Sequence, residues 1–419
     1  MAEHLVIVGG GQAAAQAVQS LRQQSFAGPI TLVCDEPYPP YQRPPLSKKY
    51  LAGELPRERL LLRPASFYGE KGVTLEQSCR VEELDLAARK VRLKDGRSLG
   101  YDRLLLATGS RVRRLDVPGS ELPGVHYLRT IGDADAITGS LTPGARAVLV
   151  GAGYIGLEVA AVLRQRGFAV TVLEALDRVL ARAVSPEVSA FYAACHRDAG
   201  VAIHCRAAVK ALHGTTRVTA VETTDGQTFA CDVVIVGIGI VPNVELAASA
   251  GLACNNGIVV DECARTADPN VAAAGDCTNH PHPLLGRRVR LESVPNAIHQ
   301  AKVAAATLLG APVAYSEVPW FWSDQYDLKL QIVGLSAGYD EVVLRGDPKT
   351  RSFAAFYLAA GQLLAVDAVN SPREFLAGKK LVASRARIAP DVLRDPNAEL
   401  AALAASDSTL APPLAGRVD

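Results

Sequence analysis

The chain has 419 residues, of which 49% are hydrophobic and 21% charged, so it is long enough for two or three globular domains. Lys and Arg number 44 against 43 Asp and Glu, a balance that argues against nucleic acid as the main partner. No apolar run approaches the roughly 20 residues that span a bilayer, and no basic leader starts the chain. We therefore expect a cytoplasmic protein that does not enter a membrane.

Two glycine-rich segments of the same kind each follow an apolar run. Both fit the pattern G-x-G-x-x-G/A between a strand and a helix, at Gly9, Gly11 and Ala14 and again at Gly151, Gly153 and Gly156. About 20 residues after each segment an acidic residue, Asp35 or Glu174, closes the next apolar run. The glycines admit a pyrophosphate, the helix N-terminus offers N–H groups, and the acid accepts from a ribose hydroxyl. The sequence therefore predicts two bound dinucleotides, a combination typical of electron transfer from a nicotinamide to a flavin.

The duplication extends beyond the glycine-rich segments. Each copy continues to an Asp-Gly hairpin turn, at residues 95–96 and 225–226, and then to an apolar strand that ends near Gly109 or Gly239. The offset between corresponding positions of the two copies is larger at the glycine-rich segments than at the hairpin turns and the strand ends. The first copy must therefore contain an insertion, and the proline-rich residues 36–46 are the candidate.

The pattern changes near Trp320, after a predicted helix at residues 293–309. Short β-rich runs follow, with a hairpin around Ala360-Gly361, and the last twenty or so residues are expected to fray. We predict an α/β fold with two Rossmann-like dinucleotide-binding domains, for FAD and NAD, and a C-terminal α+β domain. The predicted bounds are 1–110 and 240–316 for the FAD-binding domain, 111–239 for the NAD-binding domain, and 317–419 for the C-terminal domain.

Five short motifs carry a resemblance to a known family. They are residues 43–48 (RPPLSK), 107–109 (ATG), 274–276 (AGD), 292–297 (ESVPNA) and 319–325 (PWFWSDQ). Together they resemble the FAD-dependent NADH:ferredoxin reductases of bacterial oxygenase systems, the putidaredoxin reductase type, which have a glutathione-reductase-like fold. The resemblance covers nearly the whole chain, and the last two motifs are the most specific. Ala14 departs from a third glycine, which flavin sites accept because alanine still allows close helix packing.

The resemblance implies non-covalent FAD on the first glycine-rich segment. The expected ligands of its ADP half are Gly9, Gly11, Ala14 and Asp35. Glu36 is the competing ribose ligand, and the usual spacing favours Asp35. Arg43 is expected to pair with the pyrophosphate, and Lys48 to lie at the reactive edge of the flavin. The alternative for both cations is a surface loop in which they are solvated.

Further FAD contacts are implied later in the chain. They are expected from Ala107, Thr108, Gly109, Asp276, Ser293, Val294 and Trp320. Asp276 follows an apolar strand and would accept from ribitol hydroxyls, or alternatively it caps its own turn. Ser293 is expected to cap the next helix, whose N-terminus would face the flavin pyrimidine.

The second glycine-rich segment is expected to bind NADH, through Gly151, Gly153, Gly156 and Glu174. Glu174 would accept from both ribose hydroxyls and repel a 2′-phosphate, which favours NADH over NADPH. Related flavin reductases pair a Glu of the following helix with the flavin-side Lys. We therefore predict a Lys48–Glu158 ion pair beside the site of hydride transfer. The alternative is a solvated Glu158 near the helix start, stabilised by the helix dipole.

Missing cysteines separate this chain from other flavin enzymes. Disulfide reductases of this fold need two cysteines, and NADH peroxidases and oxidases one, in the segment that here reads PPLSKKY (residues 44–50). Cys34 precedes this segment and is interpreted as structural. Electrons must then leave from the flavin itself, and the expected acceptor is a [2Fe-2S] ferredoxin that supplies a monooxygenase. The alternatives are an NADH oxidase or peroxidase, and a redox-sensing flavoprotein of apoptosis-inducing-factor type.

Both tryptophans lie in residues 319–325. The resemblance places Trp320 over the flavin edge, with Lys48 and Glu158 as the other catalytic candidates, whereas Trp322 fits a core position equally well. The acidic ferredoxin would meet a basic rim, with these candidates: Arg287, Arg288, Arg290, Lys379, Lys380, Arg385 and Arg387.

No metal site is expected. The eight cysteines include no C-x-x-C pair, and the nearest metal-like pattern is Cys277 with His280 and His282. No second pair of ligands stands at a suitable spacing from it.

Overall fold

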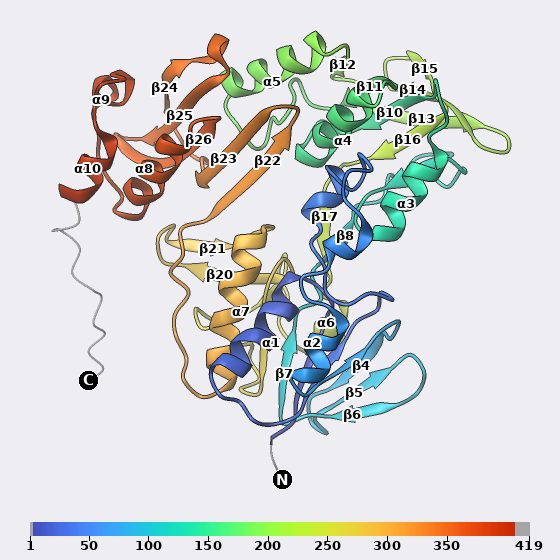
Figure 1. Ribbon diagram of the computed structural model, residues 1–419, viewed down its shortest axis with the longest axis vertical. Helices are drawn as coiled ribbons and strands as arrows, with labels where there is room; N and C mark the ends of the chain where they lie inside the picture. The colour runs from blue at the N-terminus through green and yellow to red at the C-terminus, as the bar shows by residue number, and fades with distance from the viewer. Residues whose placement is uncertain (1–2, 407–419) are drawn as a thin grey trace.

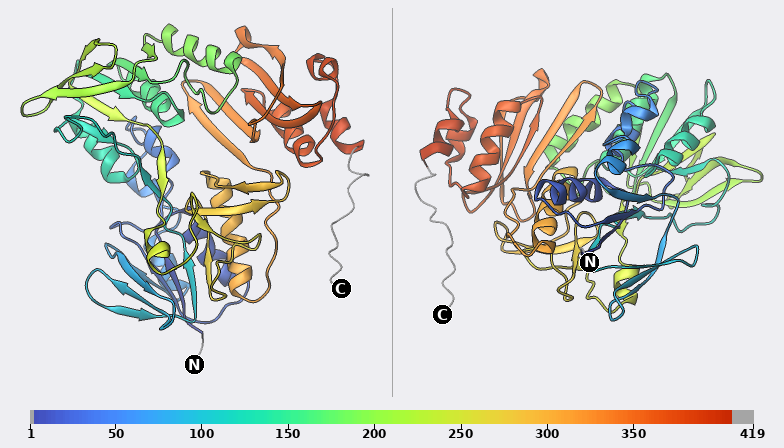
Figure 2. Two further views of the ribbon diagram at one scale, coloured as in Figure 1. Left: turned by 180° about the vertical axis from the view of Figure 1, so that it is seen from behind. Right: turned by 60° about the horizontal axis from the view of Figure 1, so that its bottom comes forward.

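The computed structural model describes residues 3–406. Three parts are visible in Figure 1: a lower part that holds the N-terminus, and two upper parts on opposite sides. Figure 2 shows the same separation from behind and from below. Each part is built on its own five-stranded sheet.

A parallel sheet forms the centre of the lower part. Most residues of its strands are buried, as expected of a parallel sheet covered on both faces. Its order is β19 (Val271–Ala273), β7 (Arg103–Leu106), β1 (Leu5–Val8), β2 (Ile30–Val33) and β3 (Val73–Glu76). Helices α1 (Gln12–Gln23) and α7 (Val294–Leu308) pack together and share a hydrophobic core with the sheet. Since α1 starts at the carboxyl end of β1, the first glycine-rich segment lies at the sheet edge where ligands bind in such folds.

Smaller elements complete the lower part. Strands β5 (Lys90–Leu93) and β6 (Ser98–Gly100) pair around the Asp95-Gly96 turn, so the first predicted hairpin is confirmed. The others are β4 (Val81–Asp85), β18 (Ile258–Val259), β20 (Thr278–His282), β21 (Arg287–Val289), α2 (Ala65–Glu70), α6 (Glu245–Ser249), and the 3-10 helices η1 (Pro44–Ser47) and η2 (Arg57–Leu60).

The second part, which carries the green and yellow-green elements of Figure 1, repeats the same plan. Its parallel sheet has the order β12 (Ala202–Cys205), β11 (Ala169–Glu174), β10 (Arg146–Val150), β16 (Val233–Val236) and β9 (Val125–Tyr127). Its helices are α3 (Ile131–Ser140), α4 (Tyr154–Gln165) and α5 (Pro186–Asp198). Strands β13 (Val209–Gly214), β14 (Val218–Thr223) and β15 (Thr228–Ala230) form a side sheet. The Asp225-Gly226 turn joins β14 to β15, which confirms the second predicted hairpin.

The predicted insertion in the first copy is confirmed. Residues 34–64 separate β2 from α2, whereas only residues 175–185 separate the corresponding β11 and α5. The longer segment contains η1, which contacts α4 of the second part. The insertion therefore carries side chains of the first part to the helix that follows the second glycine-rich segment.

The third part is an antiparallel sheet with helices on it. Its order is β22 (Trp320–Gln325), β23 (Leu328–Gly334), β26 (Gln362–Val369), β25 (Ser352–Ala359) and β24 (Glu341–Asp347). The other elements are η3 (Pro348–Thr350), α8 (Pro372–Ala383), α9 (Pro390–Arg394) and α10 (Leu400–Ser406). The predicted hairpin at Ala360-Gly361 joins β25 to β26 and is confirmed. The tail expected to fray falls mainly on residues 407–419, which lie outside the described residues.

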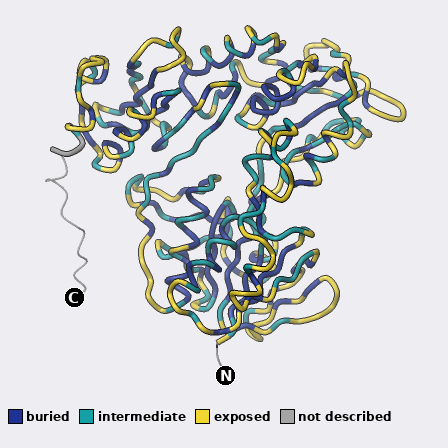
Figure 3. Tube along the Cα trace, in the orientation of Figure 1, coloured by how far each residue is buried: buried dark blue, intermediate teal, exposed yellow. Residues whose placement is uncertain are grey.

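The chain crosses between the first two parts twice, and the two crossings pair. Strands β8 (Ser110–Val112) and β17 (Ile240–Pro242) are antiparallel neighbours. They lie where the FAD and NAD domains were expected to meet, and the exact domain bounds remain a prediction. Figure 3 shows the buried backbone running through the three sheets, with exposed loops around them.

The third position of the glycine pattern differs between the copies for a steric reason. At Gly156 a Cβ would lie 2.2 Å from the carbonyl oxygen of Gly151, whereas Ala14 has a Cβ and is fully buried. Gly156→Ala is therefore expected to displace α4 and lower the free energy of unfolding by about 1–3 kcal/mol. Urea unfolding would measure this, with Gly139→Ala as control, since a Cβ on that helical glycine meets nothing within 4 Å. Equal unfolding midpoints for both variants would contradict the steric explanation.

Candidate active site where the three parts meet

The first glycine-rich turn leaves room for a ligand at the N-terminus of α1. Gly9 has a φ of +131°, and a Cβ there would lie 2.1 Å from the carbonyl oxygen of Ala107, so the position requires glycine. A Cβ at Gly11 would meet no atom within 4 Å, and no side chain caps α1. Uncapped N–H groups beside open space fit the pyrophosphate of FAD.

The two acidic residues after β2 have different surroundings. Glu36 accepts from the Tyr41 hydroxyl and from the Arg43 guanidinium, both at 2.6 Å. Asp35 is exposed, and no described residue donates a hydrogen bond to its carboxylate. Asp35 therefore retains the acceptor that a ribose ligand needs, whereas Glu36 is bound to Arg43. The assignment of Asp35 as the ribose ligand stays a prediction.

Arg43 is held by the protein itself. Besides Glu36, its guanidinium donates to the Tyr41 hydroxyl at 3.0 Å and to the backbone carbonyl of Arg129 at 2.7 Å. The alternative of a solvated cation is therefore wrong for this residue. Contact between Arg43 and a pyrophosphate stays a prediction, and in the structure Arg43 fixes Glu36 against the segment before α3.

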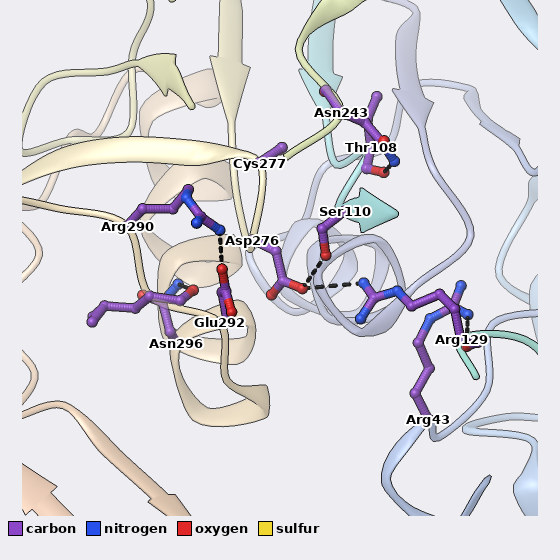
Figure 4. A network of polar contacts seen from close by, with 12 residues as sticks. Arg43, Thr108, Ser110, Arg129, Asn243, Asp276, Cys277, Arg290, Glu292 and Asn296 are labelled. Carbon is purple, nitrogen blue, oxygen red and sulfur yellow. Dashed lines mark hydrogen bonds and ion pairs between the residues drawn. The ribbon is translucent and has the colours of Figure 1, made fainter. Parts of the chain in front are cut away.

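Asp276 lies in the network that Figure 4 shows. Its carboxylate accepts from the Ser110 hydroxyl at 2.8 Å and from the Arg129 guanidinium at 3.1 Å. Since both partners are distant in the sequence, an Asp276 that only caps its own turn is ruled out. The Nε of Arg129 is buried and has no partner among the described residues. A buried donor of this kind fits an anionic ligand group.

The start of α7 is capped as predicted. The Ser293 hydroxyl accepts from the backbone N–H of Asn296 at 3.2 Å. Just before it, Glu292 pairs with Arg290, and burial raises the pKa of the Glu292 carboxyl (Figure 4). The side-chain oxygen of Asn296 is buried without a partner among residues 3–406. This helix start therefore offers a ligand both an acceptor and N–H groups, while the contacts of Ser293 and Val294 with FAD stay predictions.

The ATG motif is tied to the second crossing of the chain. Thr108 Oγ1 donates to the backbone carbonyl of Asn243 at 2.7 Å, and the Asn243 amide donates to the carbonyl of Thr108 at 2.9 Å. Gly109 follows with a φ of +63°, and Ala107 packs on Gly9. The reciprocal pair fixes both crossings beside the network of Asp276. Contacts of the three motif residues with FAD stay predictions.

The second glycine-rich turn has the same two properties as the first. A Cβ at Gly151 would lie 2.5 Å from the carbonyl oxygen of Gly237, whereas one at Gly153 would meet no atom within 4 Å. No side chain caps α4. Ile155 and Leu176 remain 44% and 39% exposed, so apolar surface is available near this turn. The turn fits a second dinucleotide.

Glu174 ends β11 and lies beside that turn. Its carboxylate accepts from the backbone N–H groups of Ala152 at 2.7 Å and Leu176 at 2.9 Å. Each carboxylate oxygen retains a lone pair for a ribose hydroxyl. The structure thus fixes the orientation of the acid, and its contact with NADH stays a prediction.

The predicted ion pair between Lys48 and Glu158 is confirmed. Lys48 Nζ lies 2.7 Å from Glu158 Oε2, and the Glu158 side chain is only 1% exposed, so the alternative of a solvated Glu158 is wrong. The hydroxyls of Ser47 and Ser323 donate to its two oxygens at 2.5 and 2.6 Å. Three donors compensate for burial of the charge. Because α4 contacts both η1 and β22, the pair joins all three parts of the molecule.

Trp320 begins β22 and is partly buried. Its ring centroid lies 5.6 Å from that of Trp322 and 5.7 Å from that of Phe375, and Lys379 Nζ lies 5.9 Å from it. Trp322 is also only partly buried, so it is not an inner core residue. The place of Trp320 over a flavin edge stays a prediction.

Two candidates for the basic rim each donate to two backbone carbonyls. Arg288 donates to the carbonyls of Val260 and Asn279, and Arg385 to those of Pro283 and Leu284. These bonds fix the two guanidinium groups on the surface. The rim as a docking surface stays a prediction.

The sequence reasoning missed four residues that shape the site: Ser110, Arg129, Tyr41 and Ser323. Arg129 directly precedes Thr130, which forms a capping box with Asp133 at the start of α3. The T-x-x-D pattern could have located this helix start. Ser323 lies inside a motif that carried the resemblance, yet no local pattern indicates that it bonds to Glu158.

Neither a metal-binding cluster nor a disulfide is found among the described residues. No group of three or more His, Cys, Asp or Glu side chains there is arranged to hold a metal ion, and all eight cysteines are unpaired. Burial, together with Asp35 and Glu36, raises the pKa of the Cys34 thiol to about 12, as expected of a structural cysteine. Within residues 3–406, no helix is both long and apolar enough to cross a membrane.

Comparison with known proteins gives matches over nearly the whole chain. The family model of pyridine nucleotide-disulphide oxidoreductases matches residues 3–301, and a reductase C-terminal model matches residues 320–404. Rhodocoxin reductase of Rhodococcus erythropolis is 47% identical, over 94% of this chain and 93% of its own.

Two solved structures are also similar. The covalent complex of putidaredoxin reductase with putidaredoxin matches at 42% identity and a TM-score of 0.94, covering 97% of this chain and 99% of the reductase chain. The ferredoxin reductase for the CYP199A2 system of Rhodopseudomonas palustris matches at 41% identity and a TM-score of 0.94, covering 96% and 100%. The predicted fold class is confirmed. The chain belongs to the pyridine nucleotide-disulphide oxidoreductase family and, within it, to the ferredoxin reductases of the putidaredoxin reductase type.

Proposed function

We propose that this enzyme takes a hydride from NADH onto FAD and passes the electrons singly to a [2Fe-2S] ferredoxin that supplies a monooxygenase. The observation that carries the proposal is the buried Lys48–Glu158 pair. It links the proline-rich loop of the first part to α4, the helix that follows the second glycine-rich turn. The similarity to rhodocoxin reductase and to a reductase solved with its putidaredoxin supports a ferredoxin as acceptor.

The residues of the chain bind, orient and supply charge. FAD, when bound, accepts a hydride and can release electrons one at a time. Gly11 and the N-terminus of α1 would receive its pyrophosphate, and Asp276 would accept from its ribitol. Lys48, kept in place by Glu158, would stabilise negative charge at the reactive edge of the flavin. Trp320 would screen that edge on the side of the ferredoxin.

NADH is preferred over NADPH because Glu174 is negative. Glu174→Gln keeps the size of the side chain and removes the charge that would repel a 2′-phosphate. We expect the ratio of kcat/KM for NADH to that for NADPH to fall by about tenfold. Steady-state kinetics with both nucleotides would measure it, with Glu187→Gln on the exposed face of α5 as control. An unchanged ratio would mean that Glu174 does not select the nucleotide.

The oxidase or peroxidase alternative needs a reactive cysteine that this site lacks. Ser47 occupies the flavin-side loop, and its hydroxyl is bound to Glu158. Cys34, the nearest thiol in the sequence, is fully buried with a raised pKa. A thiolate nucleophile is therefore absent from this loop, which favours transfer of electrons to an external carrier.

The final acceptor and the cellular location form part of the same proposal. The reductase of the CYP199A2 system, matched at a TM-score of 0.94, supports an oxygenase system of the cytochrome P450 type. Eight unpaired cysteines and the use of NADH support a cytoplasmic location, since reducing compartments keep thiols free.

Anaerobic flavin spectroscopy tests the proposal. The purified protein should be yellow, NADH should bleach it, and oxidised ferredoxin should restore the colour. NADPH serves as the control reductant. Colour that returns rapidly with oxygen but not with ferredoxin would replace the proposal by an NADH oxidase.

A further inference from the structure

A continuous chain of hydrogen bonds leads from Glu158 across the boundary of two parts to α5. Ser323 Oγ bonds to Glu158 Oε1 at 2.6 Å, and Gln325 Nε2 bonds to Ser323 Oγ at 3.2 Å. Gln325 Oε1 lies 2.9 Å from His196 Nε2, and the Tyr326 hydroxyl lies 3.1 Å from His196 Nδ1. No function assigned above uses His196, Gln325 or Tyr326.

The middle of this chain is sealed from water. Ser323 and His196 are fully buried, and Gln325 is 1% exposed. Burial lowers the pKa of His196, so its imidazole is neutral and has one N–H. A buried neutral histidine between two polar partners must be satisfied on both nitrogens, which makes its tautomer dependent on its neighbours.

The direction of every bond follows from the charge of Glu158. An ionised carboxylate only accepts, so the Ser323 hydroxyl donates its proton to Glu158. Ser323 Oγ then accepts from the amide nitrogen of Gln325, which turns the Gln325 oxygen towards His196. His196 must therefore donate from Nε2, and its Nδ1 accepts from the Tyr326 hydroxyl.

The turn that holds this chain is strained. Tyr326 connects β22 to β23 with a φ of +56°, a left-handed conformation that is unfavourable for an aromatic residue. The same backbone brings its hydroxyl to His196, and the ring centroids of the two side chains lie 5.0 Å apart. Strain of this kind persists where the surrounding structure fixes a particular side-chain placement.

We propose that Ser323, Gln325 and His196 are positioning residues that orient Glu158 for its bond to Lys48, and that the charge on Glu158 fixes the tautomer of His196. The proposal rests on the function proposed for the Lys48–Glu158 pair. It assigns to β22 and α5 a part in aligning the site of hydride transfer, although neither His196 nor Gln325 touches Lys48.

Nuclear magnetic resonance of the FAD-bound protein with ¹⁵N-labelled histidine tests the tautomer, with His196→Gln to assign the signal. The wild type should show His196 protonated at Nε2. In Glu158→Gln the side-chain carbonyl of the new glutamine should remain with the Lys48 ammonium, so the glutamine NH₂ faces Ser323. Donor and acceptor are then exchanged in every hydrogen bond along the chain. His196 should then be protonated at Nδ1. A wild type protonated at Nδ1, or the same tautomer in both proteins, would overturn the proposal.

Rapid-reaction kinetics test the positioning role. Ser323→Ala should slow reduction of the flavin by NADH by about tenfold, because one hydrogen bond to a buried charge is lost, and leave the Kd for NADH unchanged. Ser189→Ala is the matched control, since the hydroxyl of that buried serine on α5 donates to the carbonyl of Val179 and, among the described residues, has no hydrogen bond with Glu158. Equal rates for the two variants would refute the positioning role, even if ferredoxin reduction by the wild type upholds the proposed function. If NADH does not reduce the flavin of the wild type, the proposed function is refuted instead. The tautomer of His196 would still test its link to the charge on Glu158.

Discussion

Gly153→Val is expected to give a yellow, folded protein that NADH reduces poorly. Gly153 has φ −77° and ψ −175°, an extended conformation that valine adopts without strain, and a Cβ there meets no atom of the protein within 4 Å. Since the protein leaves room for a Cβ at this position, we expect the added side chain to clash with a ligand at the N-terminus of α4. We expect the Kd for NADH to rise by about a hundredfold, which corresponds to about 2.7 kcal/mol.

The equivalent change in the first copy should act on the other cofactor. Gly11 is also extended, at φ −102° and ψ −164°, and its Cβ would also meet open space. Gly11→Val should therefore yield a folded protein that has lost its yellow colour. Absorbance of the purified variants and titration with NADH separate the two effects.

Gly100→Val provides the matched control for both variants. Gly100 ends β6, and a Cβ there also meets nothing within 4 Å, but Gly100 belongs to the hairpin of β5 and β6 rather than to a glycine-rich turn. It should retain both FAD and the affinity for NADH. Full NADH affinity in Gly153→Val would contradict the assignment of the second turn to the nicotinamide dinucleotide.

Glu158→Ala is expected to lower the rate of flavin reduction by NADH by about a hundredfold, the usual effect of removing one preorganised electrostatic group. Lys48, Ser47 and Ser323 would all lose their shared acceptor inside the protein. The free energy of unfolding should fall by about 3 kcal/mol, because an unpaired charge remains partly buried. Stopped-flow absorbance measures the rate, and urea unfolding measures the stability.

Glu187→Ala on the exposed surface of α5 is the control for this change. It also removes a glutamate from the second part, but from a position open to water, so both rate and stability should remain close to the wild type. If NADH reduced the flavin of Glu158→Ala at the wild-type rate, the Lys48–Glu158 pair would have no part in hydride transfer.

Features repeated in the sequence could be predicted well. The two glycine-rich segments, both Asp-Gly hairpins and the insertion of the first copy follow from local patterns and from alignment of the copies. The Lys48–Glu158 pair could be predicted only through the family resemblance, because related flavin reductases pair a Glu of this helix with the flavin-side Lys and no local pattern links the two residues.

Contacts between distant segments could not be predicted from local patterns. Arg129 reaches Asp276 across 147 residues of sequence, and no periodicity marks that contact. The ion pair of Arg43 with Glu36 depends on how the proline-rich loop folds back on itself. The chain from Glu158 to His196 needs three segments from two parts of the molecule, so it becomes visible only in the folded structure.

The most direct test of the proposed function is NADH-driven reduction of cytochrome c by the purified protein, with and without a [2Fe-2S] ferredoxin. We expect the rate to depend strongly on the ferredoxin and on NADH rather than NADPH. Rapid NADH consumption without ferredoxin, accompanied by consumption of oxygen or peroxide, would contradict the account and identify an oxidase or peroxidase instead.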